Sequence, residues 1–348
     1  MTQNKRRLER RFPAEWERHT AVLLAWPHKD TDWAYMLDEI TECYISIIET
    51  ITINSRVILL APDAEVPRER LKHIDPERLI IVEVPTNDTW TRDYGPLTVT
   101  DCGRPRLCNF QFNGWGLKFA ACHDNRVTER LRDAGLLAVP VENRLDFVLE
   151  GGSVESDGRG TLLTTSHCLM APNRNNTMSR IQLERYLKDC FGLNHILWLD
   201  NGSLAGDDTD SHIDTLARLA PDNTIIYTGC QDANDEHFAD LQCMADQLRG
   251  LRTRDGLPYN LVELPLPDPI FDDEGNRLPA TYTNYLVDDR TLIMPTYRQP
   301  DKDTLAARML KISFPNHELL TVDCVPLIKQ HGSLHCATMQ LYPDTITL

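Results

Sequence analysis

Hydrophobic and polar positions along the chain switch repeatedly between a helical and a strand period. Apolar residues at three- and four-residue spacing predict amphipathic helices, and a Val-, Ile- or Leu-rich run that predicts a strand follows each of them. This order of a helix and then a strand returns five times. The predicted pairs are 33–53 with 56–61, 125–134 with 136–142, 178–190 with 195–199, 235–249 with 260–266, and 303–312 with 318–324.

Hairpin patterns lie between these pairs. Two short apolar runs joined by Asp, Asn, Gly or Pro residues are a good signal for an antiparallel hairpin. Four are predicted: 97–100 with 107–112, 152–155 with 161–165, 213–219 with 224–228, and 281–287 with 291–295. A fifth would pair 335–341 with 20–25 and so hold the two ends of the chain together.

Five repeats of one supersecondary unit predict an α/β fold. Radial repetition of small sheets gives a propeller with a central site. We therefore predict a five-bladed, pseudo-symmetric α/β-propeller that forms a single domain over residues 1–348. An ordinary three-layer α/β sheet is the alternative that the pattern leaves open.

Charge and composition narrow the class of protein. The net charge of −16 over 348 residues favours small cationic partners, and nucleic acid is not expected as a ligand. No run approaches the roughly 18 apolar residues of a membrane span, and residues 1–12 do not read as a secretory leader, so a cytoplasmic protein is the expectation. None of the ten cysteines forms a Cys-x-x-Cys pair, so zinc ribbons and thioredoxin-like sites are not expected.

The segment 207–214, Asp-Asp-Thr-Asp-Ser-His-Ile-Asp, places one imidazole among several carboxylates. If it is extended, Asp210, His212 and Asp214 project to one face, because strand side chains alternate. Such a cluster is costly unless a cation, a metal ion or a shared proton relieves the repulsion. The segment therefore predicts a site that holds positive charge.

Polar residues recur near the start of each predicted hairpin. If the repeats are related by pseudo-symmetry, these residues converge on the central axis and bring together a thiol, an imidazole and three carboxylates. Such groups suit a nucleophile, a general acid/base and a clamp for a cation. The residues are Asp93, Glu150, His212, Asp214, Asn284 and Cys336.

Neighbouring residues support a site that a ligand can reach. Trp90, three residues before Asp93, offers an apolar wall beside an anion, which suits a planar cation. The loop Asn-Gly-Trp-Gly at 113–116 presents Trp115 in a flexible lid. Two glycines after Glu150 let a ligand or a backbone come close.

Other chemistries stay open on these residues alone. The segment 207–214 could bind a hard cation or zinc through Asp207, Asp208, Asp210, His212 and Asp214. It has neither HExxH nor EF-hand spacing. A Cys-His-Asp hydrolase of peptides or amides would use the same residue types as the nucleophilic site.

Five motifs together resemble the agmatine deiminases, which group with the bacterial-type peptidylarginine deiminases among the guanidine-modifying enzymes and share a five-bladed α/β-propeller fold. The resemblance covers nearly the whole chain, although the segment 330–335 has less glycine than is usual in the family. The motifs are Trp-Thr-Arg-Asp-Tyr-Gly-Pro at 90–96, Asn-Gly-Trp-Gly at 113–116, Leu-Glu-Gly-Gly at 149–152, Asp-Ser-His-Ile-Asp at 210–214 and Leu-His-Cys at 334–336.

The resemblance implies a role for each matching residue. Cys336 would be the nucleophile that forms a covalent amidino-cysteine, His212 the general acid/base, and Glu150 a support for the histidine or the substrate. Asp93 and Asp214 would pair with the edges of the guanidinium. The other implied substrate-binding residues are Trp90, Trp115 and Asp208, the last near the distal amine.

The implied reaction is hydrolysis of agmatine to N-carbamoylputrescine and ammonia, with no metal or other cofactor and with assembly into a homo-oligomer. Two alternatives stay open. One is free or peptidyl arginine as the substrate, whose carboxylate would call for a cation such as Arg174 or Arg298 nearby. The other is a non-catalytic propeller that binds a polyamine.

Overall fold

The computed structural model describes residues 10–347. It contains five small sheets, and each is built on an antiparallel hairpin whose second strand pairs in parallel with a third strand. The strand orders are β1-β5-β6-β7, β10-β9-β8, β11-β12-β13, β14-β15-β16 and β17-β2-β3-β4. Residues 1–9 and Leu348 lie outside the described residues. The expectation that residues 1–12 are not a secretory leader therefore falls mostly outside them.

All five predicted helices are present, with shorter bounds at several ends. Local sequence explains α8 well: Ser179 and Gln182 form a capping box at its start, and Gly192 ends it with φ 70°. The five helices are α2 (Leu37–Thr52, preceded by the 3-10 helix η1, Asp32–Met36), α6 (Val127–Asp133, preceded by η2, Asp124–Arg126), α8 (Arg180–Phe191), α9 (Phe238–Gly250) and α10 (Pro300–Ser313).

Four of the five strands predicted to follow these helices are confirmed as β3 (Arg56–Ala61), β10 (His195–Leu199), β13 (Asn260–Pro265) and β16 (Glu318–Asp323). The prediction for 136–142 is wrong, because β7 runs from Val141 to Val148. Leu136 instead closes the turn after α6, its N–H donating to Leu131. Pro140 has no N–H to donate to a ladder, so the strand begins after it.

The predicted hairpins are also present. The fifth pairs β17 (Met339–Leu341) with β2 (Ala21–Ala25) in antiparallel register and ties the two ends of the chain together, as expected. The other four join β5 (Leu97–Asp101) to β6 (Arg104–Gln111), β8 (Val154–Ser156) to β9 (Thr161–Thr165), β11 (Ala217–Ala220) to β12 (Thr224–Gly229), and β14 (Leu286–Asp288) to β15 (Thr291–Thr296).

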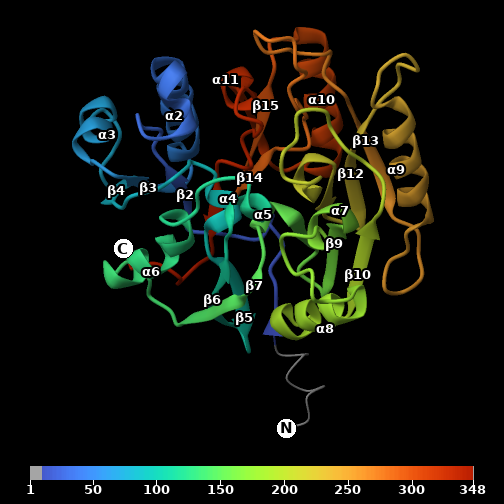
Figure 1. The fold of residues 1–348 in the computed structure, drawn as a ribbon, viewed down its shortest axis with the longest axis horizontal. Helices are drawn as coiled ribbons and strands as arrows, with labels where there is room; N and C mark the ends of the chain where they lie inside the picture. Colours follow the sequence, from blue (N-terminus) through green and yellow to red (C-terminus); the bar gives the residue numbers. More distant parts are fainter. Residues whose placement is uncertain (1–9, 348) are drawn as a thin grey trace.

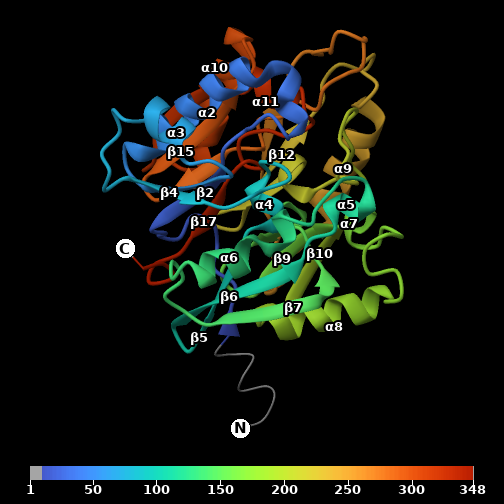
Figure 2. The ribbon, with the colours of Figure 1, turned by 60° about the vertical axis from the view of Figure 1, so that its left-hand side comes forward.

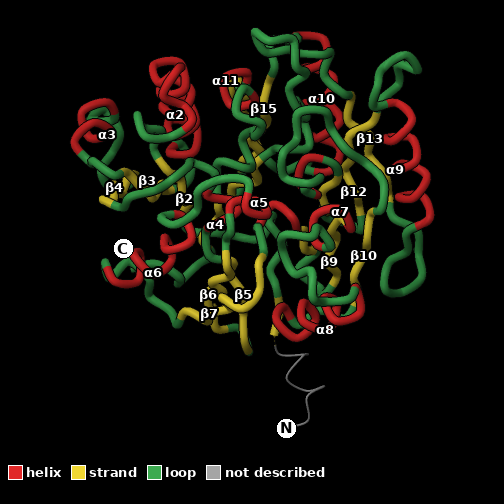
Figure 3. The backbone as a smooth tube through the Cα atoms, in the orientation of Figure 1, coloured by secondary structure: helices red, strands yellow, loops and turns green. Residues whose placement is uncertain are grey.

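The five helix-and-sheet units lie around a common centre (Figure 1). Helices α2, α8, α9 and α10 lie at the periphery, and the short helices α4 (Thr91–Tyr94) and α5 (Gly114–Leu117) lie near the middle (Figures 1 and 3). The turned view shows β6 and β7 above α8, on the side of the molecule nearest the N-terminal strand β1 (Arg10–Arg11) (Figure 2). Segments far apart in the chain therefore meet at the centre.

The sheets are the core of the molecule. All five residues of β2 and all five of β9 are buried, as expected for short strands covered on both faces. Helix α2 buries Ile40, Tyr44, Ile47 and Ile51 at three- and four-residue spacing, and each such aliphatic side chain contributes roughly 1.5–3 kcal/mol through burial. No helix within residues 10–347 has the length and apolar character required to span a bilayer.

The predicted hairpin strands begin too early in four places, since β8, β11, β14 and β17 start two to five residues later than expected. Residues Gly151–Ser153 form the 3-10 helix η3, and Ile213–Thr215 form η4. The remaining elements are α3 (Glu65–Arg70), β4 (Leu79–Glu83), α7 (Ser166–Leu169) and α11 (Val325–Ile328).

Candidate active site

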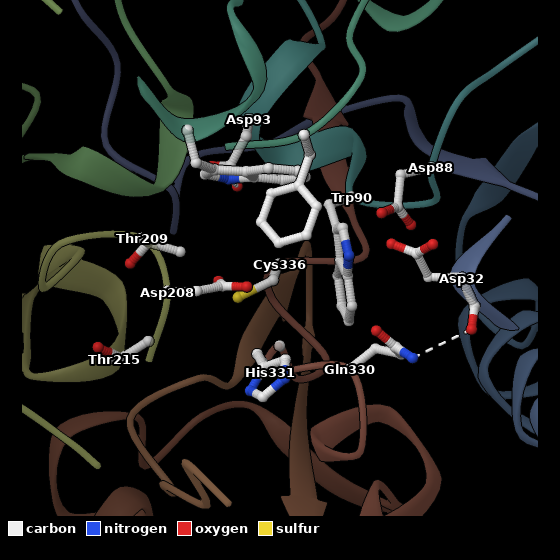
Figure 4. Close-up of a pocket in the computed structure, with 13 residues that line it drawn as sticks. Asp32, Asp88, Trp90, Asp93, Asp208, Thr209, Thr215, Gln330, His331 and Cys336 are labelled. Carbon is white, nitrogen blue, oxygen red and sulfur yellow. Dashed lines mark hydrogen bonds between the residues drawn. The ribbon is translucent and has the colours of Figure 1, made fainter. Parts of the chain in front are cut away.

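A pocket opens at the centre, between segments from all parts of the chain (Figure 4). Five of the eight predicted site residues line it, namely Trp90, Asp93, Trp115, Asp208 and Cys336. The pocket has a volume of about 450 Å³, part of which is open to solvent. Its other lining residues are Asp32, Asp88, Phe119, Thr209, Thr215, Gln330, His331 and Gly332.

Asp93, on the short helix α4, lines the pocket and also lies next to His212, which does not line it. Its Oδ2 accepts a hydrogen bond from the Trp115 indole (2.9 Å), and its Oδ1 accepts one from the N–H of Gly152 (3.0 Å). Burial raises the pKa of Asp93 to about 6, although the nearby His212 imidazole acts to lower it. Above that pH the carboxylate presents a fixed negative charge to a ligand.

His212 lies directly behind Asp93 and is fully buried. Its Nδ1 is 3.6 Å from Asp93 Oδ1, and its Nε2 is 3.7 Å from Glu150 Oε2. Burial acts to lower the pKa of His212, but Asp93, the Cys168 thiol and Glu150 outweigh it and hold this pKa well above its ordinary value. The ring is therefore an imidazolium at neutral pH, which can give a proton to a leaving group.

Gly152 shows how closely three of the predicted residues meet. A Cβ atom at this position would lie 2.7 Å from His212 Nδ1, 2.9 Å from Asp93 Oδ1 and 3.1 Å from Asp214 Oδ2. Real side chains do not approach polar atoms so closely, so only glycine fits between these groups. The backbone at η3 thus holds an imidazole and two carboxylates in mutual contact.

Cys336 reaches the pocket from the last turn before β17. Asn284 Nδ2 donates to its Sγ (3.3 Å), and Asp214 Oδ2 lies 3.7 Å from the sulfur. Burial, with Asp214 and Asp93 adding to it, raises the pKa of Cys336 well above its ordinary value. The sulfur is therefore a neutral thiol until a cation enters the pocket.

The two carboxylate oxygens of Asp214 differ: Oδ2 accepts hydrogen bonds, whereas Oδ1 has no hydrogen-bond partner among residues 10–347. Its Oδ2 accepts from His335 Nδ1 (2.8 Å) and from Asn284 Nδ2 (3.3 Å), whereas its buried Oδ1 has no hydrogen bond from any residue in 10–347. Burial acts to raise the pKa of Asp214, but the His335 hydrogen bond and nearby positive charge lower it on balance. The group is an anion ready to accept a donor.

Glu150 does not line the pocket and is held by Arg174. Arg174 Nε lies 2.9 and 2.8 Å from its two oxygens, and Cys168 Sγ lies 3.7 Å from Oε2. Burial acts to raise the pKa of Glu150, but His212 and Arg174 lower it on balance. Arg174, considered from the sequence as a partner for a substrate carboxylate, is thus occupied, and Arg298 is exposed and paired with Asp323.

The prediction that Asp210, His212 and Asp214 share one face of a strand is wrong. Asp210 and Ser211 have φ of 66° and 64°, so the segment turns sharply before η4. Asp210 points away to Arg174 (2.6 Å) and Lys118 (2.9 Å). Among residues 10–347 the aspartates of this segment do not converge as a set of metal ligands, which removes the support for a metal site there.

The loop that carries Trp115 forms a pocket wall with an unusual backbone. Residues 114–117 all have positive φ, including Trp115 at 52° and Leu117 at 68°. Each non-glycine residue in this conformation costs on the order of 1 kcal/mol. The Trp115 ring is fixed by its bond to Asp93 and by edge contact with Phe119, whose ring centre is 5.5 Å away.

The sequence did not predict a role for three residues that lie near the reactive atoms. Asn284 was expected to converge on the axis but received no role, and it bonds both the Cys336 backbone and its sulfur. His335 belongs to the Leu-His-Cys motif, in which only Cys336 was given a role. Asp88 carries no motif signal of its own beyond its place just before Trp90.

Comparisons with known proteins identify the family of this chain. A family model for the Porphyromonas-type peptidyl-arginine deiminases matches residues 11–342. The agmatine deiminase of Pseudomonas aeruginosa (strain UCBPP-PA14) is 29% identical over 358 residues, covering 95% of this chain and 95% of the relative. A solved structure from Porphyromonas gingivalis, provisionally named an arginine deiminase, is 47% identical with a TM-score of 0.91, covering 97% of this chain and 100% of that one.

A second solved structure is the agmatine deiminase of C. jejuni, in a cysteine-to-serine variant with its substrate bound. It is 37% identical, with a TM-score of 0.90, and covers 96% of each chain. The resemblance drawn from the sequence motifs is therefore confirmed. The chain belongs to the Porphyromonas-type peptidyl-arginine deiminase family, with the agmatine deiminases among its relatives, and is a hydrolase acting on the C–N bonds of amidines.

Proposed function

We propose that this protein hydrolyses agmatine to N-carbamoylputrescine and ammonia through a covalent amidino-Cys336 intermediate. The charge of the pocket carries this assignment: among residues 10–347 its lining includes Asp32, Asp88, Asp93 and Asp208, and no lysine or arginine. Agmatine has a guanidinium at one end and an ammonium at the other, so both ends suit an anionic pocket. The carboxylate of arginine would face these aspartates without a cation to bind it.

The guanidinium would lie between Asp93 and Asp214, whose Oδ1 awaits a donor. This fixed orientation removes several kcal/mol of the barrier to attack. The Cys336 thiol then gives its proton to Asp214, whose Oδ2 is 3.7 Å from the sulfur, and the sulfur adds to the central guanidinium carbon. The bound cation stabilises the thiolate that the empty pocket disfavours.

His212 would carry the protons of both half-reactions. As the imidazolium it protonates the departing nitrogen, the C–N bond breaks, and ammonia leaves an amidino group on the sulfur. Neutral His212 then takes a proton from water as the oxygen adds to the same carbon. The C–S bond breaks as the C=O bond forms and the added hydroxyl loses its proton to solvent, the ureido product leaves, and the proton held by Asp214 returns to Cys336. Glu150 orients the ring from behind, and Trp90 and Trp115 form the walls.

The five sheets of like strand order support a five-bladed propeller with this site on its axis. We propose one catalytic domain over 1–348. The residues that we assign to the reaction require no metal or organic cofactor. We keep cytoplasmic location and a homo-oligomeric state as predictions.

A panel of substrates tests the function. We expect ammonia release from agmatine with a kcat/KM at least about 100-fold above that for free arginine or an arginyl peptide, because a carboxylate buried among aspartates is strongly disfavoured. Arginine is the second candidate, since the relative from P. gingivalis at 47% identity is provisionally named an arginine deiminase. Faster turnover of arginine than of agmatine would overturn our assignment in its favour.

Asp88 predicts a pH dependence of substrate binding. Burial raises the pKa of Asp88 to about 7, and the charges of Asp32 and Asp208 add to this effect; Asp32 and Asp88 lie on one side of the pocket (Figure 4). Below pH 7 the group is neutral, and above pH 7 it is an anion. The KM for agmatine should therefore fall as the pH rises from 6 to 8, and Asp88→Asn should raise KM roughly tenfold at pH 8 with little change at pH 6.

Steady-state kinetics across this pH range checks the prediction. Asp30→Asn, on an exposed residue that does not line the pocket, is the matched control and should leave the profile unchanged. An alkylguanidine without the distal ammonium should show a much flatter KM profile. An unaltered pH dependence in Asp88→Asn would exclude Asp88 as a binding residue for the ammonium.

We propose His335 as a positioning residue for Asp214. The ring is buried, and its Nδ1 donates to Asp214 Oδ2 (2.8 Å) while Nε2 lies 2.8 Å from Glu15 Oε1 and 3.1 Å from Arg218 Nη2. Burial and the charges of Arg218 and Arg92 lower the pKa of His335. The neutral ring thus keeps a single, directed donor on Asp214.

Two substitutions at His335 separate its contacts. His335→Asn keeps an amide near the position of Nδ1 and should retain activity within about tenfold, whereas His335→Gln keeps reach toward Glu15 and should lower kcat by on the order of 10–100-fold. Loss of the donor raises the pKa of Asp214, so the acid limb of the kcat profile should move to higher pH in His335→Gln. Equal loss in both variants with an unmoved pH profile would indicate a purely structural role.

A further inference from the structure

Three side chains with metal-ligating atoms meet behind the pocket. One atom each from Glu150, Cys168 and His212 lies within 4.8 Å of the other two, and all three residues are buried. Glu150 Oε2 is 3.7 Å from both Cys168 Sγ and His212 Nε2. Cys168 has no part in the reaction proposed above.

Two of these three separations are close to those between the ligand atoms of a tetrahedral metal ion. Zinc binds sulfur at about 2.3 Å and nitrogen or oxygen at about 2.0–2.2 Å, which sets its ligand atoms roughly 3.5 Å apart. The measured 3.7 Å separations differ from that value by only a few tenths of an ångström. A second acidic cluster, Glu15 with Glu155 and His335, is already neutralised by Arg218 and Arg92 and so gives no reason to bind an ion.

The imidazole of His212 supplies an independent indication. Both of its ring nitrogens are buried and have no hydrogen-bond partner among residues 10–347. The acceptors around them, at 3.6 and 3.7 Å, are beyond the usual reach of a hydrogen bond. Asp93 next to Nδ1 also reproduces the carboxylate–histidine–metal arrangement, in which a carboxylate orients the ligating ring.

The local charge allows a divalent cation. Glu150, Asp93 and the Cys168 thiolate would bring three negative charges, against one positive charge from Arg174, whose remaining hydrogen bonds go to Asp210 and Thr209. Each oxygen of Glu150 has two lone pairs, so Oε2 can accept from Arg174 and still bind a metal ion. Asp93 lines the pocket and links it to the cluster.

We propose that Glu150, Cys168 and His212 form an inhibitory site for a thiophilic divalent cation, with Zn²⁺ as the matching chemistry. Binding would displace the proton of the Cys168 thiol and the proton on His212 Nε2, and both would pass to solvent, so the affinity should rise with pH. A metal ion on Nε2 would keep the ring from forming the imidazolium that gives a proton to the leaving group. The inhibitory effect rests on the proposed role of His212, whereas the binding site itself does not.

Cobalt(II) titration of a Cys336→Ser protein tests the site without any substrate. The exposed thiols Cys102, Cys122 and Cys243 are first capped with iodoacetamide, and Co²⁺ is added under reducing, anaerobic conditions. We expect one equivalent to bind with a thiolate-to-cobalt charge-transfer band. The band should disappear in Cys168→Ser/Cys336→Ser and persist in Cys230→Ser/Cys336→Ser, in which a buried thiol outside the site is changed.

Circular dichroism checks that each variant is folded. If the variant with Cys168→Ser does not fold, His212→Gln in the Cys336→Ser background takes its place, with an expected loss of roughly 100-fold in metal affinity. In the active enzyme, Cys168→Ser should raise the zinc concentration for half-inhibition by a similar factor. No cobalt band in Cys336→Ser, or a band that survives both the Cys168 and the His212 change, would overturn the proposal. Cobalt binding in an enzyme inert toward agmatine would sink the proposed function alone.

Discussion

Cys336→Ala should abolish ammonia release from agmatine, with a loss of on the order of 10⁴–10⁶-fold in kcat. The sulfur is the one thiol that lines the pocket within residues 10–347 and is in contact with Asp214 and Asn284, and removal of a nucleophile from a catalytic unit costs about this much. A coupled ammonia assay, with calorimetry for agmatine binding, measures both effects.

Binding should survive this change, because the carboxylates that hold the two cationic ends remain. Cys230→Ala is the matched control: it removes a buried thiol that lies outside the pocket and should retain full activity. Turnover by Cys336→Ala at a rate near that of the unmodified protein would mean that the thiol is not the nucleophile and would leave a polyamine-binding or metal-dependent role to consider.

Gly152→Ala should lower kcat/KM by on the order of 10³-fold without unfolding the protein. The added methyl would press on His212, Asp93 and Asp214 at once, at 2.7, 2.9 and 3.1 Å. Displacement of a reacting group by about 1 Å already costs roughly 10²-fold, and the shift would also disturb the hydrogen bond from the Gly152 N–H to Asp93.

Gly250→Ala is the control for this substitution. Among residues 10–347, a Cβ at Gly250, the last residue of α9, would meet nothing within 4 Å, so activity and melting temperature should stay close to those of the parent. Wild-type kinetics in Gly152→Ala would show that His212 and the two carboxylates need not be so closely placed, and would contradict the mechanism.

Much of the fold could be predicted because its signals are local. Helix periodicity, the capping box at Ser179 and the turn residues of the hairpins act over a few neighbouring positions, and the structure follows them. The wrong strand at 136–142 had the right composition. A strand over 136–142 is prevented by Pro140 and by the turn after α6. Leu137 instead forms an isolated bridge with Ile346, near the other end of the chain.

The site was less predictable where partners come from distant segments. Asp210 had the same residue type and spacing as Asp214, yet Arg174 and Lys118 draw it out of the site and require the left-handed backbone at 210–211. Cys168 resembled any other buried thiol until its contact with Glu150 was known. The sequence motifs name reactive groups well, but not the residues that orient them.

Rapid acid quench of the enzyme during its first turnovers of agmatine, followed by peptide mass spectrometry, tests the central claim most directly. We expect the peptide that contains Cys336 to carry a transient adduct equal in mass to agmatine less ammonia, which forms no more slowly than ammonia release and decays as the ureido product appears. Product formation with Cys336 unmodified at every time point, or with the adduct on another cysteine such as Cys168, would contradict the account.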